Sequence, residues 1–177
     1  FIFKVLETIS NLDFHEGEIF NEGKQSHRSS QIKWIPYNSI NLNLFKFLKN
    51  IIEDVNKTYF NFSLKGANDD IQYTEYHYNL NGNYNWHQDG DFNFEKNNPT
   101  SYLRKLSLTI QLSDPSEYEG GDLEISIPGP GETTILKTPK EKGKIIIFPS
   151  YMWHRVTPVT KGIRKSLVWW VGGEPFR

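Results

Sequence analysis

Apolar residues between positions 40 and 57 recur at steps of three and four, which is the spacing of one face of an α-helix. This face contains Leu42, Phe45, Leu48, Ile52 and Val55, with Leu44 and Ile51 beside it. Ser39 and Asn41 precede the run, and both residue types favour helix N-caps. The pattern therefore predicts one helix near residues 40–57, capped by one of these two side chains.

Beyond residue 59 the pattern changes to short apolar or alternating runs, which are typical of strands. Turn-forming pairs such as Asn81-Gly82, Gly120-Gly121 and Lys161-Gly162 separate the runs. The expected strands span residues 60–64, 70–78, 83–88, 103–112, 122–127, 133–137, 144–149, 153–158 and 163–171. Before the helix, strands are expected at residues 1–8 and 31–35, the latter ended by Pro36, with a turn and a short helix within residues 9–23.

Many short strands after one long helix favour a mainly β fold with a supporting helix (α+β), arranged as an antiparallel sandwich or jelly roll. The length of 177 residues suits a single domain. We expect residues 1–60 to form a supporting strand and helix, and residues of about 70–172 to form the core of the jelly roll. The polar stretch Asp91–Ser101 is expected to be an exposed, mobile loop.

The amino-acid composition excludes several classes of partner and of metal site. With 20 Lys and Arg against 21 Asp and Glu, the chain lacks the charge excess of a protein that binds nucleic acid through a broad basic surface. No apolar run approaches the ~20 residues of a membrane span, and the first residues lack the basic region of a signal peptide. Since cysteine is absent, any metal site must use His and carboxylate ligands, and a cytoplasmic, intracellular location is expected.

A candidate metal site lies in the segment Trp86-His87-Gln88-Asp89. Residues two apart in a strand point to the same face, so His87 and Asp89 can reach one ion. His154, at the start of another expected strand, is the best candidate for a third ligand. Two imidazoles and one carboxylate form a facial triad that leaves positions open and favours Fe(II). An H-x-D step alone also fits a surface turn, and the remaining histidines, His15, His27 and His77, are not expected to bind metal.

Arg164 follows His154 by ten residues, in a run whose alternation places Arg164, Ser166, Val168 and Trp170 on one face. A guanidinium group can hold a carboxylate through two parallel hydrogen bonds. This suits a dicarboxylate that chelates iron through its keto-acid end. A surface ion pair is the alternative role for an arginine, but together with the triad an anchor for such a dicarboxylate is favoured.

Together these motifs resemble the Fe(II)/2-oxoglutarate-dependent dioxygenases, in particular the prolyl-4-hydroxylase-like group. The resemblance rests on Tyr76, Gly82–Asp89, Asp114–Leu123, Phe148-Pro149-Ser150 and His154–Arg164. It selects His154 as the third ligand over His15, His27 and His77. The D-P-x-x-Y-x-G-G-D-L segment is similar to PKHD-type hydroxylases. The resemblance covers about residues 70–172, with a weaker match at Arg28–Pro36.

The resemblance implies a double-stranded β-helix, a jelly roll that holds Fe(II) at its mouth. It also implies 2-oxoglutarate and O₂ as co-substrates and leaves ascorbate open as a further cofactor. Oxygen would convert 2-oxoglutarate to succinate and carbon dioxide while a C–H bond is hydroxylated. A prolyl residue in a peptide or protein is the substrate that the group implies, and a free amino acid, another small molecule or a modified nucleobase remains open. A non-catalytic jelly-roll binding module and a cupin-type metal enzyme without 2-oxoglutarate are the other classes. The oligomeric state is not indicated.

Further contacts to the co-substrate are expected from the same resemblance. Tyr76 is our choice for a strand tyrosine near 2-oxoglutarate, with Tyr78 as its rival. Gln111 stands where relatives often carry a tyrosine that binds the distal carboxylate, and its amide can donate a hydrogen bond. Ser166 is expected to help hold the same carboxylate. Trp170 fits either a wall of the pocket or a core aromatic residue.

Other residues near the motifs have expected supporting roles. Trp86 and Trp153 precede proposed ligands and should face away from the iron and brace it. Gly120 and Gly121 should shape a turn rather than contact a ligand. Candidate substrate contacts in the polar loop are Asp91, Phe92, Phe94 and Lys96.

Overall fold

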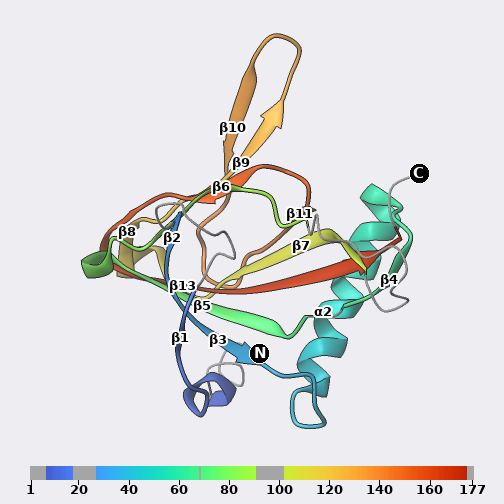
Figure 1. Cartoon of the computed structure of the whole chain (residues 1–177), viewed down its shortest axis with the longest axis horizontal. Coiled ribbons are helices and arrows are strands. Elements are labelled where there is room, and N and C mark those ends of the chain that lie inside the picture. Colours follow the sequence, from blue (N-terminus) through green and yellow to red (C-terminus); the bar gives the residue numbers. More distant parts are fainter. Residues whose placement is uncertain (1–6, 18–26, 68, 91–101, 175–177) are drawn as a thin grey trace.

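Antiparallel strands form two sheets in the computed structural model, which describes residues 7–17, 27–67, 69–90 and 102–174 (Figure 1). The larger sheet has the spatial order β1 (His15–Glu16), β3 (Gln31–Ile35), β5 (Ile71–His77), β13 (Val159–Gly173), β7 (Leu103–Gln111) and β11 (Ile145–Pro149). Two short strands, β4 (Leu64–Gly66) and β8 (Tyr118–Gly120), also pair with β13. The smaller sheet has the order β10 (Thr133–Lys137), β9 (Leu123–Pro128), β12 (His154–Val156), β6 (Asn83–His87) and β2 (Arg28–Ser29). The expected jelly roll with one supporting helix is confirmed.

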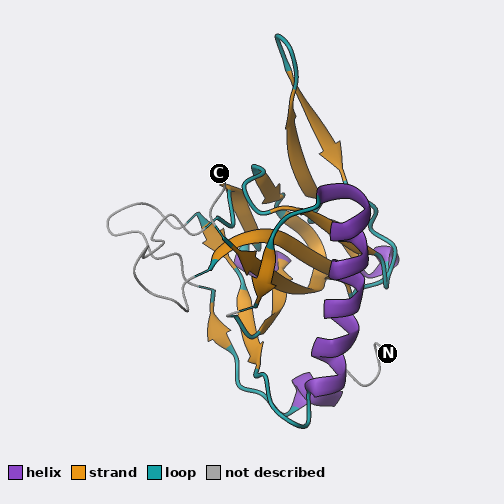
Figure 2. Ribbon diagram, turned by 90° about the vertical axis from the view of Figure 1, so that its right-hand side faces the viewer, coloured by secondary structure: helices purple, strands orange, loops and turns teal. Residues whose placement is uncertain are grey.

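The supporting helix α2 (Leu42–Val55) runs along one side of the molecule (Figure 2). Its buried residues Phe45, Leu48 and Ile52 belong to the same apolar cluster as the inner strands of the larger sheet. Asn41 is the N-cap by position, but its side chain makes no capping hydrogen bond and donates to the Pro36 carbonyl at 3.0 Å. The expectation of a side-chain cap is therefore wrong, because the preceding turn uses the amide of Asn41.

The inner strands of the larger sheet, β5, β13 and β7, are largely buried on both faces, and the two faces differ in chemistry. In β7, Leu106, Leu108 and Ile110 belong to the apolar cluster shared with α2. The intervening residues, Ser107, Thr109 and Gln111, are also buried and point to the opposite face. Strands β5 and β13 show the same alternation: Ile71, Tyr73, Leu167 and Trp169 in the cluster, and Gln72, Thr74, Arg164 and Ser166 on the other face. The polar face is turned towards the smaller sheet, where it lines a cavity.

Several expected boundaries need correction. Residues 60–64 are not a strand, because α2 continues as a π-helical turn over Asn56–Phe60 and the next strand is β4. Residues 7–10 are helical, so the strand expected at residues 1–8 is wrong there, while residues 1–6 lie outside the described part. Lys161-Gly162 does not end a strand: β13 runs through it, with Gly162 at a φ of 70°. A register shift between Val159 and Lys161 accommodates this geometry.

Strands β9 and β10, at one edge of the smaller sheet, form a hairpin that projects away from the other strands (Figure 1). The prediction of strand β10 at residues 133–137 is confirmed to the residue. Every residue of β10 is exposed. Within the described residues, no helix is long and apolar enough to cross a membrane.

Candidate metal centre and co-substrate pocket

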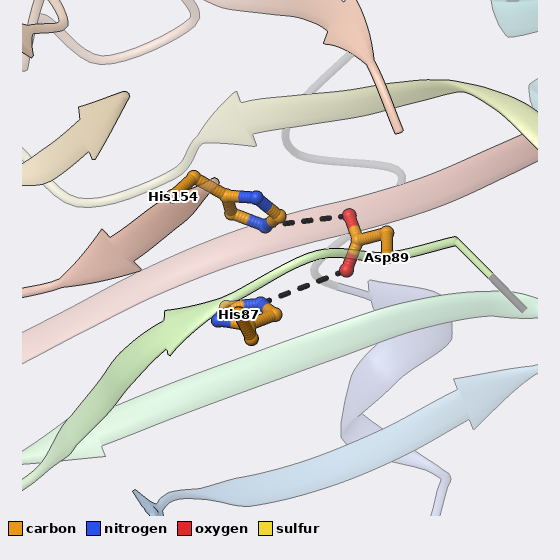
Figure 3. Close-up of side chains that lie close together, drawn as sticks. All are labelled: His87, Asp89 and His154. Carbon is orange, nitrogen blue, oxygen red and sulfur yellow. Dashed lines mark ion pairs between the residues drawn. The ribbon is translucent and has the colours of Figure 1, made fainter. Parts of the chain in front are cut away.

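His87, Asp89 and His154 meet at the ends of two neighbouring strands of the smaller sheet (Figure 3). His87 ends β6 and lies directly opposite His154, which begins β12. Asp89 follows β6, and its two oxygens lie 3.6 Å from His87 Nε2 and 3.4 Å from His154 Nε2. The potential ligand atoms all lie within 4.8 Å of one another, so the structure brings together the three residues proposed from the sequence.

Hydrogen bonds around the three side chains orient their ligand atoms. His87 Nδ1 lies 2.7 Å from the Asn85 carbonyl, and His154 Nδ1 lies 2.9 Å from the Met152 carbonyl. A nitrogen that faces a carbonyl carries a proton, so Nε2 is the atom of each ring that can bind a metal ion. The Ser107 hydroxyl donates to Asp89 Oδ2 at 2.7 Å. Such partners fix the orientation of metal ligands.

The protonation states fit a metal site. Burial is the main cause that lowers the pKa of His87 to about 4, and the positive charge of His154 is the second cause. Burial alone would raise the pKa of Asp89, but the charge and hydrogen bond of His154 hold it well below its usual range. Burial alone would lower the pKa of His154, but Asp89 outweighs this effect and raises it. At neutral pH His87 is therefore neutral and Asp89 ionised, and a metal ion competes with the proton of His154.

A stack of side chains that the sequence did not reveal supports His87. The rings of Tyr84 and His87 are stacked with centroids 3.4 Å apart, and the Arg28 guanidinium lies 4.8 Å from the Tyr84 centroid. Tyr84 and His87 are three residues apart, so regular alternation would place them on opposite faces. The register between β6 and β12 shifts at this point, which brings both side chains to one face. The only sequence signal for Arg28 and Tyr84 was their place in the family motifs.

Arg164 lies at the other end of the cavity and is 1% exposed. Its guanidinium donates to Ser166 Oγ at 3.2 Å and to Gln111 Oε1 at 3.0 Å. Burial lowers the pKa of Arg164, an effect that Tyr76 and Tyr118 partly oppose. Gln111 thus turns its oxygen towards Arg164, while its amide nitrogen faces the Pro139 carbonyl at 3.4 Å. The Gln111 side chain thus orients the arginine, and a contact between Gln111 and the co-substrate stays a prediction.

One cavity of about 260 Å³ joins the two ends of the site. Its lining includes the three candidate metal ligands, Arg164, and the expected contacts Tyr76, Ser166 and Trp170. Tyr76 is buried and its ring centroid lies 5.5 Å from the Arg164 guanidinium carbon, whereas Tyr78 is exposed. The geometry therefore favours Tyr76 over Tyr78 as the tyrosine of the pocket. Arg28, Trp34, Gln72, Tyr84, Arg104 and Thr109 also line the cavity and were not singled out as site residues from the sequence.

Gly121 lies against the side chain of Arg164, where a larger residue would collide with it. Both Gly120 and Gly121 have positive φ angles, which confirms the expected turn. A Cβ atom at Gly121 would lie 3.0 Å from Arg164 Cδ and 2.9 Å from Val159 Cγ2. The glycine therefore also leaves room for the buried arginine side chain.

The remaining sequence expectations have mixed outcomes. His15 and His27 are exposed, and His77 binds Glu75 at 2.7 Å, so none of the three joins the candidate metal centre. Trp153 is exposed and cannot brace its neighbour through burial, whereas Trp86 packs under the Arg155 guanidinium. The proposed loop contacts Asp91, Phe92, Phe94 and Lys96 lie outside the described residues.

A jelly roll that presents two histidines and one aspartate to a cavity offers the ligand set of a non-haem iron site. The chain belongs to the 2OG-Fe(II) oxygenase superfamily, whose family model matches residues 71–172. The matched range contains the candidate metal ligands and Arg164. Membership implies Fe(II), 2-oxoglutarate and O₂ as cofactor and co-substrates.

Curated relatives agree with this family. A PKHD-type hydroxylase of Aliarcobacter butzleri (strain RM4018) is 37% identical over 94 residues, which cover 53% of this chain and 40% of the relative. A PKHD-type hydroxylase of Xylella fastidiosa (strain 9a5c) is 45% identical over 73 residues, which cover 41% of this chain and 30% of the relative. The matches thus span less than half the length of these curated relatives.

Solved structures agree with the fold. A prolyl hydroxylase from Trichoplax adhaerens, in complex with a hypoxia inducible factor peptide fragment, superposes with a TM-score of 0.70 at 18% identity. The match covers 97% of this chain and 77% of that one. A Pseudomonas putida prolyl-4-hydroxylase superposes with a TM-score of 0.66 at 18% identity, covering 96% and 81% of the two chains. At such identities the likeness shows the fold alone.

Proposed function

We propose that this protein is an Fe(II)- and 2-oxoglutarate-dependent oxygenase that hydroxylates a prolyl residue in a peptide or protein. In this proposal His87, Asp89 and His154 hold the iron, and Arg164 anchors 2-oxoglutarate. The observation that carries it is a buried cation, Arg164, that faces the same cavity as the triad and, among the described residues, makes hydrogen bonds only to neutral side chains.

The fit of the residues to 2-oxoglutarate rests on Arg164. A buried charge without a partner of opposite sign is costly. In the described part of the chain, Arg164 forms no ion pair with a carboxylate: Tyr118, a neutral group, is a further hydrogen-bond partner, and Asp122 attracts the guanidinium only from beyond ion-pair distance. The Nε of Arg164 has no hydrogen-bond partner among the described residues. The indole N–H of Trp170, which also lines the cavity, is buried without a partner as well. A dicarboxylate in the cavity would supply both the missing charge and the missing acceptors.

The triad fits Fe(II) by its donor set and by the states of its groups. The two Nε2 atoms and the Asp89 carboxylate offer three ligands from one side, which leaves positions for the keto acid and oxygen. Bound iron would supply the oxidative chemistry that splits 2-oxoglutarate and transfers one oxygen atom to carbon. The protein's own contribution is to hold the ligands in place, bind the distal carboxylate through Arg164 and surround the reacting atoms with Tyr76, Trp170 and other cavity walls.

Support for a prolyl substrate comes from the similar proteins. The two solved structures are described as prolyl hydroxylases, and one of them is in complex with a peptide fragment. The curated relatives are PKHD-type hydroxylases. These similarities support a peptide or protein as the class of substrate.

The first test is spectroscopic. Anaerobic addition of Fe(II) and 2-oxoglutarate should produce the visible charge-transfer absorption of a keto acid chelated to ferrous iron. His87→Ala should abolish the band, and Arg164→Gln should shift its appearance to much higher 2-oxoglutarate concentrations. His77→Ala serves as the matched control, because His77 pairs with Glu75 away from the triad. Absence of the band in the wild type at millimolar 2-oxoglutarate would refute the proposed function.

The second test addresses the substrate. Synthetic peptides with a single proline should gain one oxygen atom in the presence of Fe(II), 2-oxoglutarate and O₂, as measured by mass spectrometry. Succinate formation without any peptide oxidation across such a panel would move the assignment to a free amino acid or another small molecule.

A further inference from the structure

The β9–β10 hairpin carries an apolar face whose position follows from strand register. His154 pairs with Ile125, and Ile125 pairs with Leu136 on β10. Residues directly opposite each other in antiparallel strands point to the same side of the sheet. Ile125 and Leu136 therefore share the face of His154, and Ile127 joins them because it is two residues further along β9.

This inner face continues the wall of the cavity. Leu123 and Val156 line the cavity on the same face as His154. Ile127 is two residues beyond Ile125 along β9, in the direction of the hairpin turn and away from Leu123. The hairpin itself projects from the molecule (Figure 1). Ile125 is buried, but Leu136 is 47% and Ile127 40% exposed. An apolar strip thus leads from the candidate metal centre onto the open hairpin.

The outer face of the same hairpin is different. Glu124 pairs with Lys137 in register, and Arg155 binds Glu124 at 2.8 Å. Ser126 stands opposite Ile135, which is 43% exposed. The charged groups at the base of the hairpin therefore lie on the face that is turned away from the cavity. The inner face offers only apolar and hydroxyl side chains, which suit an uncharged partner.

We propose that the inner face of the hairpin, formed by Ile127 and Leu136, binds the stretch of polypeptide substrate next to the residue that enters the cavity. This inference rests on the proposed function. Neighbouring strands lie about 4.8 Å apart, so Leu136, two strands from His154, is about 10 Å from it. An extended chain advances about 3.3 Å per residue. An apolar side chain about three residues from the reacting one would therefore meet the hairpin.

A polypeptide fits this surface better than a small molecule for two reasons. A free amino acid bound at the iron could not reach side chains about 10 Å away. In addition, β10 is the last strand of its sheet among the described residues, so its outer edge is open to backbone hydrogen bonds. Together, the apolar face and the open edge match the side chains and the backbone of an extended peptide.

The test uses a pooled library of synthetic peptides, each with one central proline and randomised flanking residues. After incubation with Fe(II), 2-oxoglutarate and O₂, mass spectrometry identifies the oxidised peptides. The wild type should select peptides with an apolar residue about three positions from the proline. Leu136→Asp should lower peptide oxidation about tenfold and remove this preference, since it puts a charge against an apolar side chain.

Ile135→Asp is the matched control, because Ile135 is the neighbouring residue, is similarly exposed and points to the outer face. It should oxidise the library like the wild type. The charge-transfer absorption with 2-oxoglutarate should be unchanged in both variants, which separates this inference from the proposed function. Equal losses in both variants, or a preference unchanged in Leu136→Asp, would overturn the inference. Oxidation of free proline or another small molecule, with none of the peptides, would overturn it as well.

Discussion

The two ends of the cavity are built for opposite charges. At one end, Asp89 and two imidazoles gather donor atoms within 4.8 Å of one another and form a site for a cation. At the other end, Arg164 is itself the cation, held by the neutral oxygens of Ser166 and Gln111. The first end lies on the smaller sheet and the second on the larger sheet. A molecule that chelates a metal ion through one of its ends and carries a carboxylate at its other end would match both ends of the cavity.

The two ends are also held in place by different means. Arg164 comes from the interior of β13, whose alternate residues pack into the apolar cluster beneath α2. The metal ligands stand at strand ends, where backbone carbonyls and the Ser107 hydroxyl orient them. Core packing thus fixes the anion end, whereas polar contacts fix the metal end. Substitutions can therefore disable one end and leave the other intact.

The largest expected effect is at the metal end. His154→Ala should lower Fe(II) affinity by more than about 100-fold, because losing a ligand costs more than losing a partner of a ligand. Anaerobic Fe(II) titration measures this change. His77→Ala should bind iron like the wild type. If His154→Ala also bound iron normally, the proposed ligand set would be wrong.

At the anion end, Arg164→Gln should weaken 2-oxoglutarate binding by roughly 100-fold, since it removes one charge of a buried pair. The wild type should also be stabilised against heat by 2-oxoglutarate, because a ligand of the native state shifts unfolding. This shift in Tm should vanish in Arg164→Gln and persist in Arg155→Gln, whose arginine binds Glu124 instead. Fe(II) affinity should stay unchanged in both variants. A coupled loss of iron binding would show that the two ends are not independent.

Much of this arrangement could be predicted from local sequence patterns. Helix α2 and most of the strands follow from apolar spacing, and the face shared by Arg164, Ser166, Val168 and Trp170 follows from alternation in β13. These features depend on residues that are close in the chain. The family motifs added the choice of His154 as the third ligand.

Features that depend on distant contacts could not be predicted. The stack of Arg28, Tyr84 and His87 needs a bulge and a strand from the N-terminal part of the chain. The orientation of the Gln111 amide depends on the Pro139 carbonyl, 28 positions away. The strand expected at residues 60–64 failed because α2 continues into a π-helical turn, which apolar spacing alone does not reveal.

A smaller effect is expected at Ser107, which contacts the candidate ligand Asp89 but is not itself a ligand. Ser107→Ala removes the hydroxyl that donates to Asp89 Oδ2 and should lower Fe(II) affinity roughly tenfold. Thr109→Val is the matched control, because Thr109 is the next residue on the same face of β7. It should leave iron affinity unchanged. Equal iron affinities in Ser107→Ala and the wild type would show that the backbone contacts alone orient the carboxylate.

The smallest effect concerns Asp122, which lies 2.8 Å from Lys140 Nζ and 3.2 Å from Lys137 Nζ. Burial alone would raise the pKa of Asp122, but the two lysines outweigh it and lower the pKa. A carboxyl whose pKa is lower in the folded state stabilises the fold above its unfolded pKa of about 3.9, and this contribution disappears as the pH falls through the folded value.

Asp122→Asn should therefore reduce the free energy of unfolding at pH 7 by less than about 1 kcal/mol, because the pair is partly exposed. The difference from the wild type should shrink as the pH falls below about 4. Denaturant unfolding of both proteins across this pH range measures the change, and a difference independent of pH would contradict it. Asp122 attracts Arg164 without forming an ion pair with it, so 2-oxoglutarate binding should change much less than in Arg164→Gln. The anion end would then owe its selectivity mainly to the buried arginine, with a smaller effect from Asp122 at the base of the hairpin.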